Sequence, residues 1–85
     1  MAEKKLVGKI THFFDKIGVG VVELSAGLKQ GDMISIEGAT TNFTQTVDSM
    51  QVEHNVIDEA KSGDAVGMKM IERVRPGDQV FRLVN

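Results

Sequence analysis

Two histidines are the side chains of this 85-residue chain with the clearest potential for chemistry. His12 and His54 stand 42 positions apart, each with an acidic residue nearby, so they could hold a metal ion or act as an acid–base pair. No third ligand stands at a diagnostic spacing, and none of the four serines lies in a G-x-S-x-G nucleophile elbow. We therefore favour ordinary strand or loop histidines over a metal-assisted hydrolase, and we expect neither a metal nor another cofactor.

The glycine-rich segments do not predict a phosphate site. Gly18-Val19-Gly20 completes neither G-x-G-x-x-G nor a P-loop, and no long helix follows that could direct its N-terminus at a phosphate. There is also no GTPase motif. The sequence thus predicts a protein that is not an enzyme and that does not bind GTP.

The net charge of −2 conceals an uneven distribution of charged residues. Residues 1–16 and 69–85 each carry a local charge of +2, whereas residues 17–68 carry −6. If the terminal strands are neighbours, their basic side chains form one patch. An ordinary solvated surface is the alternative, because a few Lys and Arg residues are a weak indication of nucleic-acid binding. Phe13 shares a strand face with Lys9, where it could stack on a base or be buried.

Length and composition predict one domain, residues 1–85, in a cytoplasmic protein. The absence of cysteine excludes a disulfide framework and fits a reducing compartment. Residues 1–5 are too few and too polar for a signal peptide, and we expect them to be flexible. No apolar run approaches the roughly 20 residues that span a bilayer, so no membrane partner is expected.

Alternating apolar residues and valine-rich runs predict six strands, at residues 6–14, 19–24, 33–37, 43–53, 65–70 and 79–84. In the first strand, Leu6, Ile10 and Phe14 share one face, and Gly8 suggests a bend or a close backbone approach. The longest strand changes parity between Val47 and Met50, which predicts a β-bulge. Residues 55–62 are too short for a stable helix and are expected to form a loop.

Three related turns precede apolar runs, and each has a basic residue two positions before Gly-Asp. They are Lys29-Gln30-Gly31-Asp32, Lys61-Ser62-Gly63-Asp64 and Arg75-Pro76-Gly77-Asp78. Gly63 and Gly77 are predicted to adopt positive φ, which glycine tolerates best. A repeated turn-then-strand unit predicts a small all-β barrel or sandwich, and six strands with short turns favour the barrel.

These motifs resemble domain 2 of the translational GTPases, the β-barrel that follows the GTPase domain in elongation factor Tu and bacterial initiation factor two. The likeness rests on Val7-Gly8-Lys9-Ile10, on residues 27–32 with Ile34 and Ile36, and on residues 47–50, 58–68 and 75–78. The chain is most similar to small stand-alone translation elongation factor-like proteins, which share FTQTVDSMQVEH. The resemblance implies a six-stranded Greek-key β-barrel of the elongation factor Tu domain 2 type.

The resemblance also implies a binding site. In elongation factor Tu the barrel helps to hold the aminoacylated 3′ end of tRNA through a glutamate, an arginine and a leucine. The corresponding positions are Gln51, His54 and Lys69, none of which matches the family's residue type. The expected function is a stand-alone, non-enzymatic module that binds RNA (tRNA or rRNA) or a translation component. The candidate binding residues are Gln51, His54, Lys69, Lys9, Phe13, Arg73 and Arg75.

A second resemblance leads to a different class of function. Similar barrels are accessory modules of enzymes, including the C-terminal module of collagenase-like peptidases, whose last strand follows a Val-x-Pro-Gly-Asp-like turn. Val74-Arg75-Pro76-Gly77-Asp78 has this form here. This alternative implies a protein-interaction module that acts in trans beside a separate catalytic chain. The sequence leaves the oligomeric state open.

Overall fold

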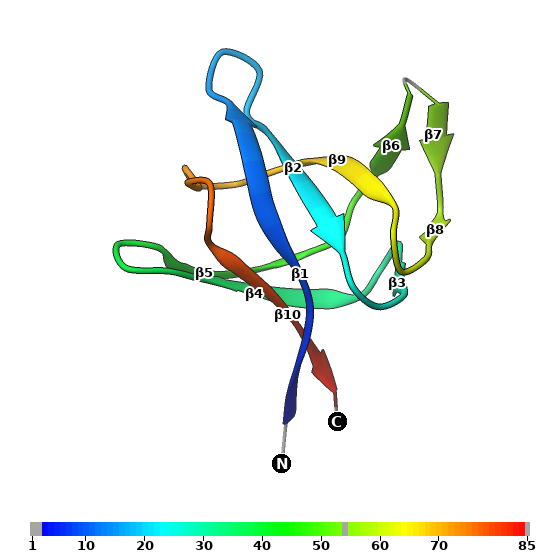
Figure 1. Cartoon of the computed structure of the whole chain (residues 1–85), viewed down its shortest axis with the longest axis horizontal. Coiled ribbons are helices and arrows are strands. Elements are labelled where there is room, and N and C mark those ends of the chain that lie inside the picture. The colour runs from blue at the N-terminus through cyan, green and yellow to red at the C-terminus, as the bar shows by residue number, and fades with distance from the viewer. Residues whose placement is uncertain (1–2, 54, 85) are drawn as a thin grey trace.

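The computed structural model describes residues 3–53 and 55–84, and these residues are all-β (Figure 1). Within them the strands are β1 (Glu3–Phe14), β2 (Val19–Leu24), β3 (Leu28–Lys29), β4 (Met33–Glu37), β5 (Asn42–Thr46), β6 (Met50–Val52), β7 (Asn55–Ile57), β8 (Glu59–Ala60), β9 (Ala65–Lys69) and β10 (Gln79–Val84). The all-β prediction is confirmed. In this part of the chain there is no helix long and apolar enough to cross a membrane.

Eight of the strands form one antiparallel sheet in the order β5-β4-β10-β1-β2-β9-β6-β7, while β3 and β8 form a separate pair. The first and last strands lie side by side, with Glu3 opposite Val84, as Figure 1 shows. The sheet is open, because β5 and β7 are edge strands within the described residues. The predicted closed barrel of six strands was therefore wrong.

The sheet stays open because the predicted strand over residues 43–53 is interrupted. The backbone N–H and C=O of Val47 bond to the turn at Gly31 and Asp32, and not to a neighbouring strand. The chain then resumes as β6, so the parity change is real but comes from a break between two strands. Residues 55–62, predicted to be a loop, contain β7 and β8. The predicted strands at 19–24, 33–37 and 79–84 are confirmed.

Two register shifts in β1 change which residues face the interior. One lies between Leu6 and Gly8 against β10, and the other lies between Ile10 and His12 against β2. As a result Leu6 and Phe14 remain 46% and 47% exposed, although they were predicted to share the face of buried Ile10. Gly8 makes the expected close approach, since a Cβ there would lie 2.6 Å from the Glu23 carbonyl oxygen.

The core consists of apolar side chains from almost every strand and from the loops that follow them. Its members are Val7, Ile10, Val22, Leu24, Leu28, Ile34, Ile36, Phe43, Val47, Met50, Ala60, Val66, Met68, Met70, Val74 and Val80. Burial of this apolar surface is the main favourable contribution to folding.

The three Gly-Asp turns have the same geometry. In each, the aspartate carboxylate accepts a hydrogen bond of 2.9 Å from the backbone N–H three residues earlier. The glycines have φ of 95° at Gly31, 94° at Gly63 and 97° at Gly77, as a type II turn requires at its third position. The prediction of positive φ at Gly63 and Gly77 is confirmed.

Each turn also holds one buried residue from a distant part of the chain. The glycine N–H donates to that residue's carbonyl oxygen, and that residue's N–H donates to the carbonyl oxygen of the aspartate. The residue is Val47 for the first turn, Leu24 for the second and Ile10 for the third, with N···O distances of 2.7–2.9 Å. The turns therefore provide hydrogen-bond partners for the backbone N–H and C=O groups of buried residues, which would otherwise be unpaired in the interior.

A side chain connects edge strand β5 to the segment that follows β9. The amide of Gln45 donates to the Lys69 carbonyl oxygen at 2.8 Å, and its oxygen accepts from the Ile71 N–H at 2.9 Å. Gln45 is only 7% exposed, so this amide replaces the backbone bonds that a closing strand would make.

Replacing Gly63 with alanine tests the turn geometry. Nothing lies within 4 Å of the added Cβ, so the cost is backbone strain alone, about 1–2 kcal/mol of unfolding free energy. Gly27→Ala is the matched control, because its Cβ would make only an ordinary contact of 3.6 Å without positive φ. Urea unfolding should show that Gly63→Ala lowers the unfolding free energy clearly more than the control does. Equal decreases in the two variants would contradict the turn assignment.

Removing the Gln45 amide tests the connection across the open side of the sheet. Gln45→Ala leaves the Lys69 carbonyl and the Ile71 N–H without this hydrogen-bond partner. The unfolding free energy should therefore fall by about 1–3 kcal/mol. Thr44→Ala on the exposed face of β5 should cost well under that amount. Hydrogen exchange at the Ile71 amide should also accelerate in Gln45→Ala, and unchanged exchange would show that the bond is unimportant.

Candidate functional site

The predicted binding residues lie in three separate places. Phe13, Arg73 and Arg75 line one hollow. Gln51 and Lys69 line a second hollow, and Lys9 lines a third. His54 lies outside the described residues. The structure therefore brings together three of the seven candidates at one site and two at another.

The first of these, which we call the arginine hollow, has a volume of about 510 Å³ and is lined by Phe13, Asp15, Arg73, Val74, Arg75 and Pro76. It lies between the end of β1 and the loop that precedes β10. Val74 is buried in the core, whereas Arg73 and Arg75 on either side of it are exposed. Phe13 is half-buried: it packs against the core and also lines the hollow.

The loop that carries the two arginines is held at its C-terminal end by two hydrogen bonds. The Arg75 N–H donates to the Asp78 carboxylate, which is only 5% exposed, and the Gly77 N–H donates to the Ile10 carbonyl oxygen. Gly38 leaves room for this carboxylate, because a Cβ there would clash with the Asp78 side chain. The third Gly-Asp turn thus fixes where the arginine hollow lies.

The second hollow lies on the outer face of the sheet, over β2, β9 and β6. It measures about 120 Å³ and is lined by Val19, Ser49, Gln51, Gly67, Met68 and Lys69. A neighbouring hollow of about 300 Å³ adds Phe14, Ile17, Val21, Glu53 and Ala65. Sequence reasoning missed this apolar face, because the register shifts in β1 that expose Phe14 are not visible in the alternation of residue types.

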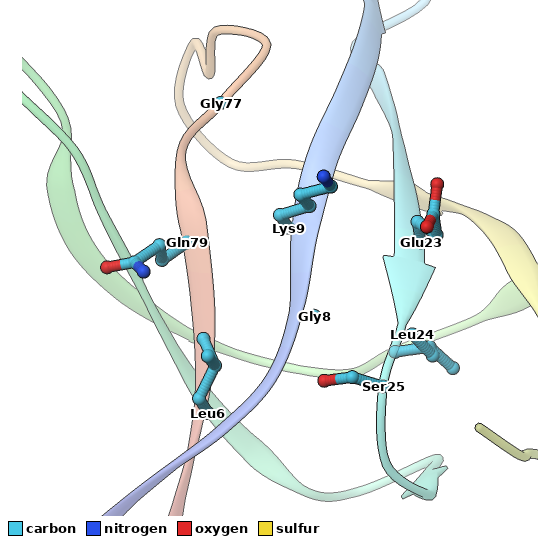
Figure 2. Close-up of a pocket in the computed structure, with 8 residues that line it drawn as sticks. All are labelled: Leu6, Gly8, Lys9, Glu23, Leu24, Ser25, Gly77 and Gln79. Carbon is cyan, nitrogen blue, oxygen red and sulfur yellow. The ribbon is translucent and has the colours of Figure 1, made fainter. Parts of the chain in front are cut away.

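The third hollow lies over the middle of β1 and measures about 370 Å³. Figure 2 shows its lining, in which Gly8 and Lys9 lie on β1, Leu6 and Gln79 lie toward β10, and Glu23 and Ser25 lie on the β2 side. Lys9 is opposite Gln79 on β10 and opposite Glu23 on β2. The hollow therefore presents an amine, an amide, a carboxylate and a hydroxyl beside one exposed leucine.

The two basic ends of the chain become neighbours as predicted, but part of their charge is paired with carboxylates. Lys4 Nζ lies 2.8 and 3.1 Å from the carboxylate oxygens of Glu37, and Ser35 Oγ donates to Glu37 at 2.9 Å. The hydrogen bond from Lys4, and to a smaller extent that from Ser35, lowers the pKa of Glu37 below its ordinary range. Arg82 faces Asp32 at 4.0 Å.

In residues 3–53 and 55–84, no group of three His, Asp or Glu side chains gathers closely enough to hold a metal ion. His12 is exposed, and its ring lies 4.4 Å from that of Phe14 at an angle of 54°. This histidine therefore makes an aromatic contact on the surface.

The curated relatives of the chain are named as peptidases. A protein of Methanocaldococcus jannaschii named as an uncharacterized protease is 41% identical over 78 residues. A collagenase of Porphyromonas gingivalis is 34% identical over 82 residues. These matches cover 91% and 94% of this chain but 19% and 23% of the relatives, so the chain spans about a fifth of their length. No protein-family model matches the chain.

Two crystal structures of the C-terminal domain of a putative U32 peptidase from Geobacillus thermoleovorans superpose on almost the whole chain. One has a TM-score of 0.87 with 23% identity and covers 95% of this chain and 93% of that domain. The other, a selenomethionine variant, has a TM-score of 0.86 with 22% identity and covers 89% and 96%. The chain has the fold of this C-terminal domain.

These comparisons correct the functional predictions. The expected kinship with translation elongation factor-like proteins and the RNA-binding role were wrong, because the relatives are named as a protease and a collagenase. The prediction that the protein lies outside the enzymes was also wrong, since the relatives are named as a protease and a collagenase. The turn signature identified a β-fold, which does not fix function. The resemblance to collagenase-like peptidases agrees with these findings.

Replacing Glu37 with glutamine tests the ion pair at the end of the sheet. Because the folded-state pKa of Glu37 is lowered, its stabilisation is present above the unfolded-state pKa and is lost as the pH falls through the folded-state pKa. Glu37→Gln should therefore be less stable than the parent at pH 7, and the difference should shrink as the pH falls below the ordinary glutamate pKa of about 4.3 and vanish below the lower folded-state pKa. Chemical denaturation across pH 2–7 measures this.

The control for this experiment is the same substitution in a Lys4→Met background. Lys4 supplies the largest part of the pKa shift, so most of the pH-dependent difference should disappear there. A difference that persists unchanged without Lys4 would contradict the assignment.

Proposed function

We propose that the chain is a peptidase-family domain of the U32 type that contributes polypeptide binding to proteolysis. The observation that carries this proposal is the extent of the match. More than nine-tenths of the chain aligns with about one-fifth of a protease and a collagenase, at 41% and 34% identity. Its fold is that of a C-terminal domain from a putative peptidase of the same type.

The surface is consistent with polypeptide binding. The hollows over β1 and beside the arginines fall within the volumes of about 300–1,000 Å³ that are usual for ligand sites. Their linings mix apolar side chains with amine, guanidinium, amide and carboxylate groups. An extended polypeptide presents the same mixture, because its backbone is polar and its side chains alternate in direction.

A chimera of the collagenase tests the proposal. The matched 82-residue segment of the Porphyromonas gingivalis enzyme is replaced by this chain, and hydrolysis of denatured collagen is measured. We expect the chimera to retain activity within about tenfold of the parent, a loss of no more than about 1.4 kcal/mol in transition-state stabilisation. Deletion of the segment should cause a larger loss.

Binding by this chain alone provides a second measurement, which does not depend on the folding of the chimera. The chain is titrated against immobilised denatured collagen, with heat-unfolded chain as the control. Saturable binding by the folded chain supports the proposal. A chimera no more active than the deletion, together with the absence of saturable binding, would refute it.

A further inference from the structure

We propose that the arginine hollow binds an acidic side chain of a polypeptide, with Arg73 and Arg75 holding the carboxylate and Phe13 contacting the aliphatic part of the ligand. This inference rests on the proposed function only for its choice of a polypeptide as the ligand. The site itself follows from the placement and charge of these three residues.

The two arginines are presented together because of the residue between them. Val74 is 1% exposed and belongs to the core, so Arg73 and Arg75 extend on the opposite side of the segment, both exposed and both lining the hollow. Pro76 restricts the backbone, and the turn to Asp78 fixes its end. Less freedom is therefore lost on binding than with two arginines on a mobile loop.

The guanidinium groups of the hollow are available for a ligand. Neither Arg73 nor Arg75 is in an ion pair with a described residue, whereas Lys4 is paired with Glu37 and Arg82 faces Asp32. A guanidinium offers donors in a planar fork that matches the two oxygens of a carboxylate. Lys4 and Arg82, which face carboxylates of the chain itself, are thus different from the two arginines that line this hollow.

The charge of the hollow fits a carboxylate. Two arginines and Asp15 give its lining a net charge of +1, which one aspartate or glutamate of a ligand would neutralise. A nucleic-acid backbone instead carries a charge at every phosphate and needs a continuous basic track. Residues 17–68 carry a charge of −6 and the whole chain carries −2, which disfavours such a ligand.

Phe13 provides an apolar wall. Its ring is half-buried and packs against the core, so its position is set by the fold, and its exposed part faces the hollow. An aromatic surface beside a charged fork can contact the methylene groups of a glutamate while the guanidinium groups bind its carboxylate. The hollow thereby favours an acidic side chain within a polypeptide over a free inorganic anion.

The test is a titration of the isotope-labelled chain by NMR with two probes. One is a blocked hexapeptide with two glutamates, and the other is the same peptide with glutamines in their place. The glutamate peptide should shift the resonances of Phe13 and residues 73–76 saturably and bind at least about tenfold more tightly, as expected for a lost charge-assisted contact.

Single substitutions assign the binding to the hollow. Arg73→Gln and Arg75→Gln should each weaken binding of the glutamate peptide about tenfold. Phe13→Leu should weaken it less while the fold is retained. Lys61→Gln is the matched control, because Lys61 is exposed and takes the position of Arg75 in the second Gly-Asp turn, so its affinity should be unchanged.

Three results would overturn the proposal. They are equal binding of the two peptides, unchanged affinity in both arginine variants, and tighter binding of a single-stranded RNA hexamer through the same residues. Failure of this titration with an active collagenase chimera would remove the acidic-peptide site and leave the proposed function standing. Saturable binding of the glutamate peptide, with an inactive chimera and no saturable binding to denatured collagen, would retain the acidic-peptide site and refute the proposed function.

Discussion

The hydrogen bonding of three buried residues by three Gly-Asp turns is the constraint on which the rest of the structure depends. Ile10, Leu24 and Val47 contribute apolar side chains to the core, and each also gives its backbone N–H and C=O to a turn. An unpaired backbone group in the interior costs about as much as a lost hydrogen bond, so each turn fixes its residue strongly. The positive φ of each glycine allows the turn to meet this requirement.

The shape of the surface follows from the same arrangement. The bonds at Val47 take the chain out of the sheet after β5, which leaves the sheet open and gives Gln45 its place in the gap. The bonds at Ile10 hold the third turn against β1, so that the loop before β10 lies beside Phe13. The arginine hollow therefore exists because the third turn supplies the hydrogen bonds of the buried Ile10 backbone.

Much of the fold could be predicted because its determinants are local. Alternation placed β2, β4 and β10 at their observed bounds, and the Gly-Asp pattern predicted positive φ at Gly63 and Gly77. The faces of β1 could not be predicted, since its register shifts arise from pairing with two different neighbours. For the site, residue type and charge selected Phe13, Arg73 and Arg75 but also Lys9, and the family resemblance selected Gln51 and Lys69; these last three lie elsewhere.

The sequence by itself determined the all-β class, most of the strand positions and the turn chemistry, because these depend on side-chain alternation and on the freedom of glycine within a few residues. Tertiary structure decided whether the sheet closes, which faces of β1 are buried and which charged residues meet. Those outcomes depend on contacts between distant segments, such as Lys4 with Glu37 and Gln45 with Lys69. Such contacts have no signature in the spacing of residues along the chain.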